Sequence, residues 1–195
     1  MKLVAGLGNP GSRYEKTRHN VGFRVIDELA RRWGIGPFRQ QFSGLAAAGR
    51  FRDEKVLLVK PMTFMNRSGQ SVREALTFHK LEPADLLVVV DDMALPLGRV
   101  RLRPQGSAGG HNGLTDIIQQ LGTDAFARLR IGIEQVAGEE MVGHVLSPFS
   151  REEEEIVGPA VVRAADATEC WAMAGVNEAM SRFNRTDDQA DKKQE

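Results

Sequence analysis

The segment Leu86–Asp92, with the sequence LLVVVDD, joins an unbroken apolar run to two carboxylates. Five apolar residues in succession are typical of a strand that is buried on both faces of a sheet. We therefore predict a central strand at Leu86–Val90, with Asp91 directly past its carboxyl end. A buried carboxylate is costly unless hydrogen bonds satisfy it, so the end of this strand is the first candidate for a functional site.

Strand and helix patterns alternate on both sides of this segment. The further strands are predicted at residues 2–7, 45–51, 56–60, 100–103, 128–133 and 141–146. The helices are predicted at residues 21–33, 66–78 (or from 68), 114–121, 152–173 and 176–183. Asn20 is the expected N-cap of the first helix. Such alternation predicts an α/β domain with a parallel or mixed sheet.

The composition describes a chain of ordinary globular type. The 195 residues fit one domain, and residues 184–195 read as a polar tail. The 26 basic and 26 acidic residues cancel, so any basic patch for a nucleic acid must be local. Cys170 is the only cysteine, and no apolar run approaches the ~20 residues of a membrane span. We expect a soluble cytoplasmic protein.

Several polar side chains follow the predicted strands at their carboxyl ends. Asn9 follows the first strand, and Met65 with Asn66 follow the strand that ends at Lys60. In open α/β sheets, ligands bind at this edge. Segments that are far apart in the sequence are therefore expected to meet there, and His19 lies at the start of the first helix, where it can join them.

The histidines and acidic residues suggest general-base chemistry. A lone histidine is more often structural, and we interpret His79, His111 and His144 in that way. His19 differs because Asp91 is an expected partner: a buried aspartate that accepts the imidazole N–H would fix its tautomer. Asp92 is a competitor for that role. No serine or cysteine nucleophile stands out, so this pair predicts activation of water.

Two other kinds of site are disfavoured. The segment Gly6–Gly11 satisfies G-x-G-x-x-G, but a dinucleotide site needs a helix that begins within the motif. The first helix is predicted to begin only near Val21, so we expect no nucleotide cofactor. We also expect no metal, because metal-ligand motifs such as H-E-x-x-H and C-x-x-C do not occur.

Arginines supply the local basic patch that the net charge allows. Arg99, Arg101 and Arg103 alternate, so on a strand they point to one side, and Arg128 and Arg130 repeat the spacing. A glycine-rich loop follows the first stripe and opens a helix, which suits an anionic group. The patch favours contact with a nucleic-acid backbone; the alternative is an ordinary solvated sheet face.

Five ordered motifs resemble those of bacterial-type peptidyl-tRNA hydrolases: GLGNPG (6–11), YEKTRHN (14–20), KPMTFMN (60–66), DDMALPLG (91–98) and GSAGGHNG (106–113). The resemblance runs from Lys2 to about Phe183. It implies a monomeric α/β enzyme, a single globular domain (1–183) with a twisted mixed β-sheet flanked by helices. Residues 184–195 would then be a flexible tail. Such an enzyme cleaves the ester between a peptide and the 3′-terminal ribose of tRNA without a metal or cofactor.

The same resemblance assigns roles to particular residues. His19 would be the general base and Asp91 its orienter, with Asn9 in the catalytic group. Asn66 and Asn112 would hold substrate and the activated water together with Asn9.

The remaining assignments concern the cleft and the tRNA. Tyr14 and Met65 would line the cleft, and Arg103 and Arg130 occupy the positions that hold tRNA phosphate. Ala94 stands where the family usually carries a polar residue. The alternative within this resemblance is a catalytically silent RNA-binding relative of the splicing-factor type, with peptidyl-tRNA hydrolysis as the discriminating assay.

Overall fold

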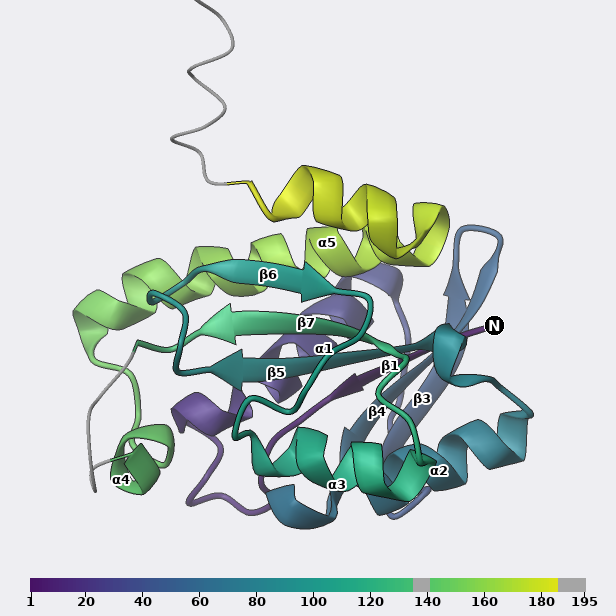
Figure 1. The fold of residues 1–195 in the computed structure, drawn as a ribbon, viewed down its shortest axis with the longest axis horizontal. Helices are drawn as coiled ribbons and strands as arrows, with labels where there is room; N and C mark the ends of the chain where they lie inside the picture. The colour runs from purple at the N-terminus through teal and green to yellow at the C-terminus, as the bar shows by residue number, and fades with distance from the viewer. Residues whose placement is uncertain (135–140, 186–195) are drawn as a thin grey trace, which may run out of the picture.

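A seven-stranded mixed sheet forms the centre of the computed structural model, which describes residues 1–134 and 141–185 (Figure 1). The strand order is β2-β3-β4-β1-β5-β7-β6. Strands β4, β1, β5 and β7 run parallel, whereas β2, β3 and β6 are joined to their neighbours by antiparallel pairing. The strands are β1 (Lys2–Gly6), β2 (Arg39–Gln41), β3 (Gly44–Phe51), β4 (Glu54–Pro61), β5 (Leu86–Asp92), β6 (Val100–Arg103) and β7 (Ala127–Gly132).

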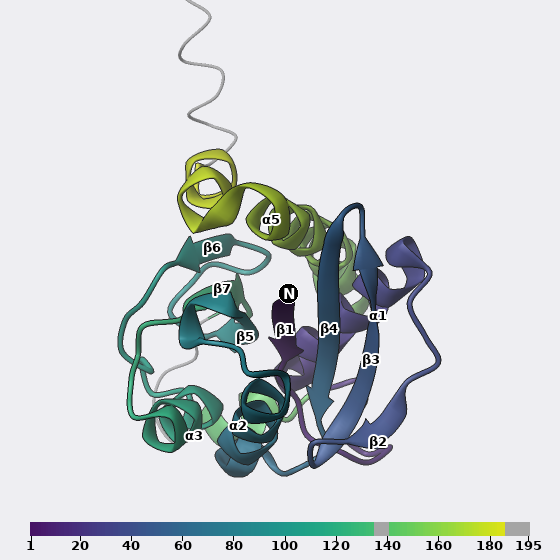
Figure 2. The same cartoon turned by 90° about the vertical axis from the view of Figure 1, so that its right-hand side faces the viewer.

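Helices cover both faces of the sheet (Figure 2). The helices α1 (Val21–Trp33) and α5 (Arg151–Phe183) pack together on one face, and α2 (Ser68–His79) and α3 (Asn112–Leu121) pack together on the other. Each pair closes its own apolar core. The expected α/β class, with a mixed sheet flanked by helices, is confirmed.

The alternation of side chains along the central strands explains why there are two cores. In β1, Val4 points into the core under α1 and α5, while Leu3 and Ala5 point into the core under α2 and α3. In β5, Val89 and Val88 are divided in the same way, and all seven residues of the strand are buried. A strand that buries both faces needs the unbroken apolar run seen in the sequence.

The parallel strands bring the expected residues to one edge. β1, β4, β5 and β7 end at Gly6, Pro61, Asp92 and Gly132, and the register aligns β1 with β5 and β5 with β7. The segments with Asn9, Met65 and Asp91 therefore follow or end neighbouring strands at the same edge, as predicted from the sequence.

One predicted strand is wrong. Residues 141–146 were expected to be extended, but Met141–Val145 is the short helix α4. A short apolar run does not separate strand from helix by its periodicity, and tertiary contacts decide. His144 was expected in that strand. Its Nε2 lies 3.0 Å from the Ile133 carbonyl oxygen, so the predicted structural role of this histidine stands.

The C-terminal helical region agrees with two predicted helices that meet near residue 175. Gly175 has φ 82° and ψ 174°, which breaks the helical geometry of α5 at this point. Asn184, the first residue of the expected tail, is hydrogen-bonded to β6: its Oδ1 accepts from the Leu102 N–H at 2.7 Å, and its Nδ2 donates to the Leu102 carbonyl at 3.1 Å. Residues 186–195 of that tail lie outside the described part of the chain.

Helix α1 lies very close to the sheet at Gly22. A methyl group at this position would come within 2.5 Å of the backbone N and O of Leu7 and 2.6 Å of the Val89 carbonyl oxygen. Because these are backbone atoms, they cannot yield without moving a strand end. This contact sets the position of the first turn of α1 and of the residues just before it.

We predict that Gly22→Ala destabilises the protein by about 1–3 kcal/mol or more, because it overpacks a closed contact. Gly143→Ala is the matched control, since a methyl group there meets nothing within 4 Å. Urea unfolding of both variants measures the effect, and equal free energies of unfolding would refute this account of α1 packing.

Candidate active site

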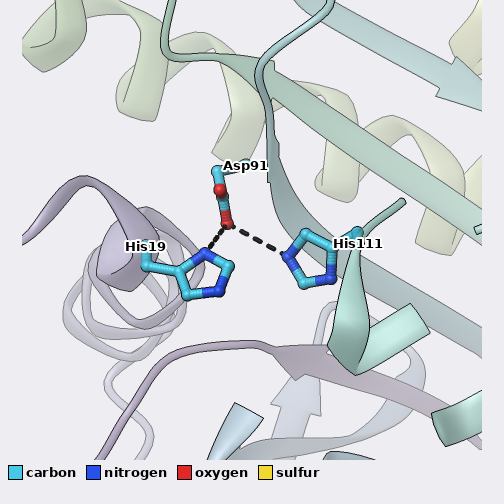
Figure 3. Close-up of side chains that lie close together, drawn as sticks. All are labelled: His19, Asp91 and His111. Carbon is cyan, nitrogen blue, oxygen red and sulfur yellow. Dashed lines mark hydrogen bonds and ion pairs between the residues drawn. The ribbon is translucent and has the colours of Figure 1, made fainter. Parts of the chain in front are cut away.

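His19 and Asp91 form a direct contact at the carboxyl edge of the sheet. His19 Nδ1 lies 2.7 Å from Asp91 Oδ1, although the residues are 72 positions apart in the sequence (Figure 3). His19 belongs to the three-residue 3₁₀ turn η1 (Arg18–Asn20), directly before α1, and Asp91 is the penultimate residue of the buried strand β5. The predicted pairing of this histidine with this aspartate is present in the structure.

A second imidazole reaches the same carboxylate oxygen. His111 Nε2 lies 3.1 Å from Asp91 Oδ1, and Figure 3 shows Asp91 between the two rings. His111 also caps α3, because its Nδ1 accepts the Leu114 N–H at 3.3 Å. A nitrogen that accepts carries no proton, so Nε2 carries it and donates to Asp91. The interpretation of His111 as merely structural therefore missed a contact within the site.

Asp91 is held as a carboxylate by these partners. Burial by itself raises the pKa of this group, but electrostatic attraction to His19 and His111 and the hydrogen bonds from both rings hold its pKa well below the usual range. The anion accepts a hydrogen bond from His19 Nδ1–H. The other ring nitrogen, Nε2, therefore points away from Asp91 and is left as a hydrogen-bond acceptor.

Asp92 does not compete for the histidine. Its Oδ2 accepts from Arg130 at 3.1 Å, and its Oδ1 accepts the Ala94 backbone N–H at 2.8 Å. The second contact also shows how the loop after β5 is held although residue 94 has no polar side chain. The open question between Asp91 and Asp92 is thus decided by geometry in favour of Asp91.

Asn9 is fixed from two sides beside the dyad. Its Oδ1 accepts the Met65 N–H at 2.9 Å, and its backbone N–H donates to Asn20 Oδ1 at 2.8 Å. Asn20 returns a hydrogen bond from Nδ2 to the Asn9 carbonyl at 3.0 Å. Asn20 stands at the N-cap position of α1 but makes no side-chain cap, so its predicted capping role is wrong: it ties the first loop to the helix instead.

Met65 lies close to the start of α3. Met65 is buried in the turn η2 (Met65–Arg67), and its sulfur lies 2.7 Å from where a side chain on Gly113 would begin. The glycine therefore makes room for Met65 beside the start of α3. Asn66 and Asn112 are exposed, and they directly follow Met65 and His111 in the sequence.

Tyr14 is not drawn into the group. It is half-buried, and its hydroxyl accepts a hydrogen bond from the Arg13 guanidinium, which also lies over its ring. Its carbonyl accepts from Thr17 Oγ1 at 2.8 Å. These contacts all lie within the loop before η1. Tyr14 is therefore close to His19 in the sequence but makes no contact with the His19–Asp91 pair.

The three clustered side chains also raise the question of a metal. The ligating atoms of His19, Asp91 and His111 all lie within 4.8 Å of one another. However, two ligand atoms that bind one tetrahedral zinc ion at about 2.0–2.2 Å lie roughly 3.3 Å or more from each other, whereas Asp91 Oδ1 lies 2.7 and 3.1 Å from the two nitrogens. These are hydrogen-bond lengths, so the observed arrangement fits shared protons and not a metal ion.

The arginine patch forms a second site beside the dyad. Arg101, Arg103, Arg128 and Arg130 line a pocket of about 340 Å³ together with Asp92. The pairing of β6 with β7 sets Arg101 opposite Arg130 and Arg103 opposite Arg128. Arg99 does not share this face, since its guanidinium donates to the Asn184 carbonyl at the end of α5.

The arginines of this pocket differ in what they can offer a ligand. Arg128 is fully buried and donates to the carbonyls of Gly106, Asp124 and Phe126. Burial, followed by repulsion from Arg130, lowers its pKa to about 10. Its role is to hold the glycine-rich loop.

Arg130 is divided between two partners. It pairs with Asp92 and donates to the Ser107 carbonyl at 2.9 Å. Arg103 is exposed at the end of β6, so of the two predicted phosphate-binding arginines it is the more accessible.

Comparison with known proteins identifies the family of this chain. The family model described as peptidyl-tRNA hydrolase matches residues 3–193. The chain belongs to the peptidyl-tRNA hydrolase family. It is 51% identical over 185 residues to the peptidyl-tRNA hydrolase of Rhodopirellula baltica, covering 94% of this chain and 97% of that protein. It is 48% identical to that of Halalkalibacterium halodurans, covering 94% and 100%.

A solved structure supports the same assignment. The crystal structure of peptidyl-tRNA hydrolase from Acinetobacter baumannii matches with a TM-score of 0.89 and 37% identity, covering 94% of both chains. These relatives leave the splicing-factor alternative without support. Among residues 1–134 and 141–185, no helix is both long and apolar enough to cross a membrane.

The lowered pKa of Asp91 predicts how stability depends on pH. Its folded-state pKa lies below the value of about 3.9 in an unfolded chain. The pairing therefore stabilises the fold above about pH 4, and this contribution is lost as the pH falls further. In Asp91→Asn, the free energy of unfolding should fall less steeply over this range than in the wild type.

Urea unfolding at a series of pH values between about 3 and 7 measures this difference. Asp53→Asn, an exposed change in the β3–β4 turn, should keep the wild-type pH dependence. Parallel curves for the wild type and Asp91→Asn would show that this carboxylate is not selectively stabilised.

Proposed function

We propose that this member of the peptidyl-tRNA hydrolase family cleaves the ester between a peptide, or an N-blocked aminoacyl group, and the 3′-terminal ribose of tRNA. The released tRNA then returns to translation. The observation that carries the proposal is the buried His19–Asp91 pair, present in a chain whose relatives bear this name over nearly their full length. A histidine that is oriented by a carboxylate is suited to take a proton from water.

The proposed mechanism uses His19 as the general base. Its Nδ1–H donates to Asp91, so Nε2 accepts a proton from a water molecule. The water oxygen attacks the ester carbonyl carbon, and the resulting tetrahedral species collapses by breaking the bond to the ribose oxygen. The proton on Nε2 passes to that oxygen, which leaves as a hydroxyl, and the peptide leaves as a carboxylic acid that releases its remaining proton to solvent. A positioned base of this kind contributes about 10²–10⁴-fold to the rate.

The asparagines supply uncharged donors for the substrate. The side-chain oxygen Oδ1 of Asn9 accepts the Met65 N–H, which turns the side-chain nitrogen Nδ2 of Asn9 away from Met65 and makes it a donor for substrate or water. Asn66 and Asn112 are exposed and are proposed to hold the peptide and the activated water. One donor to a developing oxyanion is worth roughly 10²–10³ in rate.

The cleft and the arginine pocket complete the substrate contacts. Met65 and Tyr14 are proposed to line the peptide side, and Arg103 and Arg130 to bind tRNA phosphate. Support for the two arginines comes from the pocket that they line together with Asp92, the residue after Asp91. Guanidinium groups fit phosphate oxygens in pairs and position a nucleic acid without reading its sequence.

We also infer that the protein works in the cytoplasm as a monomer, without a metal or cofactor. All side chains of the proposed catalytic group come from one chain, so a second copy is not needed. The proposed catalytic domain is residues 1–183, with 184–195 as a C-terminal tail whose first residue, Asn184, is hydrogen-bonded to β6.

His19→Ala should reduce single-turnover cleavage of peptidyl-tRNA by about 10²–10⁴-fold, because it removes the proposed base. The free energy of unfolding should fall by about 1–3 kcal/mol, because buried Asp91 loses one hydrogen bond, whereas the affinity for tRNA should change little. His79→Ala, at the end of α2 and away from the dyad, is the matched control and should keep wild-type turnover. Cleavage that persists in His19→Ala would exclude the general-base role, and a chelator should leave the wild-type rate unchanged.

Arg103→Ala should weaken tRNA binding and flatten its salt dependence. The loss of one phosphate contact lowers the slope of log K against log salt by about 0.7–0.9. Arg52→Ala, an exposed arginine in the turn between β3 and β4, should leave both quantities unchanged. Binding titrations at several salt concentrations compare the two, and identical slopes would place the phosphate contact elsewhere.

A further inference from the structure

Arg18, the residue directly before His19, is one of the most highly connected side chains of the described chain. It is only 7% exposed. Its guanidinium donates to both carboxylate oxygens of Glu153, at 2.7 and 2.6 Å, to Ser147 Oγ at 2.6 Å and to the Pro148 carbonyl. It also lies over the Phe149 ring, 5.0 Å from its centroid.

The backbone repeats this connection. The Arg18 N–H donates to the Ser147 carbonyl at 3.0 Å, and Thr17 forms a β-bridge with Pro148. The segment before His19 is therefore joined to the segment before α5 by main chain and side chain together. The two segments lie about 130 positions apart in the sequence.

Glu153 is itself held in place at the start of α5. It occupies the third position of a capping box: its carboxylate accepts the Ser150 N–H at 2.6 Å, and its own N–H donates to Ser150 Oγ at 3.2 Å. Burial raises the pKa of Glu153, but the Ser150 N–H and the Arg18 guanidinium outweigh burial and lower it overall. The acceptor for Arg18 is thus a fixed, charged group on the longest helix.

His19, by contrast, lies in a turn that has little stabilisation of its own. The turn η1 contains three residues and has no side-chain cap, and short 3₁₀ segments have poor hydrogen-bond geometry. A misplacement of about 1 Å in a reacting group can cost about 10²-fold in rate. The position of the imidazole therefore depends on what fixes its neighbours.

We propose that Arg18 and Glu153 form a clasp that positions His19 for proton transfer, and that both are positioning residues of the reaction. This inference rests on the proposed role of His19 as the base. Neither side chain contacts the dyad; they act through the backbone of η1. A buried ion pair is weak evidence for a gain in stability, so a role in geometry is a better reason for burying this one.

The neighbouring pair Arg24–Glu154 provides a matched control. It joins α1, the helix that directly follows η1, to the same start of α5 by two hydrogen bonds of 3.0 and 2.8 Å, but both side chains are more exposed and neither residue adjoins His19. If these links to α5 mattered only for stability, breaking either pair would have the same kind of effect on the protein, and only the size of the effect would differ.

The experiment compares Glu153→Gln with Glu154→Gln in the full-length protein. For each variant we would measure kcat and KM for peptidyl-tRNA cleavage, unfolding by urea, and the NMR signal of the His19 Nδ1 proton. Glu153→Gln should lower kcat at least tenfold with KM within twofold, and shift or broaden the His19 signal. Glu154→Gln should leave all of these at their wild-type values.

A milder variant guards against a failure to fold. Glu153→Asp keeps the charge but shortens the reach to Arg18 by one methylene, and should give an intermediate kcat and a shifted His19 signal in a fully folded protein. If folded Glu153→Asp and Glu153→Gln keep the kcat and the His19 signal of Glu154→Gln, the clasp does not position His19.

The NMR readout separates this inference from the proposed function. If the wild type does not cleave peptidyl-tRNA, the proposed function fails, whereas the His19 signal still reports whether Glu153 controls the histidine. An unmoved signal in both Glu153 variants overturns the clasp in either case.

Discussion

The structure depends on a buried carboxylate that must be satisfied. Asp91 is 3% exposed at the end of the central strand, and two imidazoles supply its hydrogen bonds. Those imidazoles come from η1 before α1 and from the first turn of α3, on opposite sides of the sheet edge. The cost of burying one charge therefore holds three distant segments together, and the contact that would activate His19 also fixes the architecture around it.

Two consecutive carboxylates serve two different sites because a strand turns successive side chains to opposite sides. Asp91 faces the histidines, and Asp92 faces Arg130 and, at 3.7 Å, Arg101. The end of β5 thus places a proton-transfer group and a basic pocket next to each other. In the proposed reaction these correspond to the ester and to the tRNA phosphate, so one strand end sets the distance between chemistry and recognition.

The parts of this arrangement that follow from local pattern could be predicted from the sequence. The apolar run of β5 and the helical face of α1 were predicted at Leu86–Val90 and Val21–Trp33, and parallel topology was enough to expect Asp91 near His19. The contact of His111 could not be predicted in this way, because it depends on the path of a glycine-rich loop whose positive-φ residues have no side-chain pattern. The role of Asn20 could not be predicted for a related reason. An asparagine amide can cap a helix or hydrogen-bond to the backbone of a loop, and the sequence does not separate the two.

The charge balance of the molecule agrees with an enzyme that must release a polyanion. The net charge is zero, and within the basic pocket Arg128 is engaged by carbonyls and Arg130 by Asp92. Non-specific binding of nucleic acid grows with each phosphate that a free cation neutralises. Internal partners therefore limit the background attraction, while an exposed Arg103 remains for contact. Because free tRNA is the proposed product, moderate electrostatic attraction favours turnover over retention, and specificity is left to the geometry of the ester beside His19.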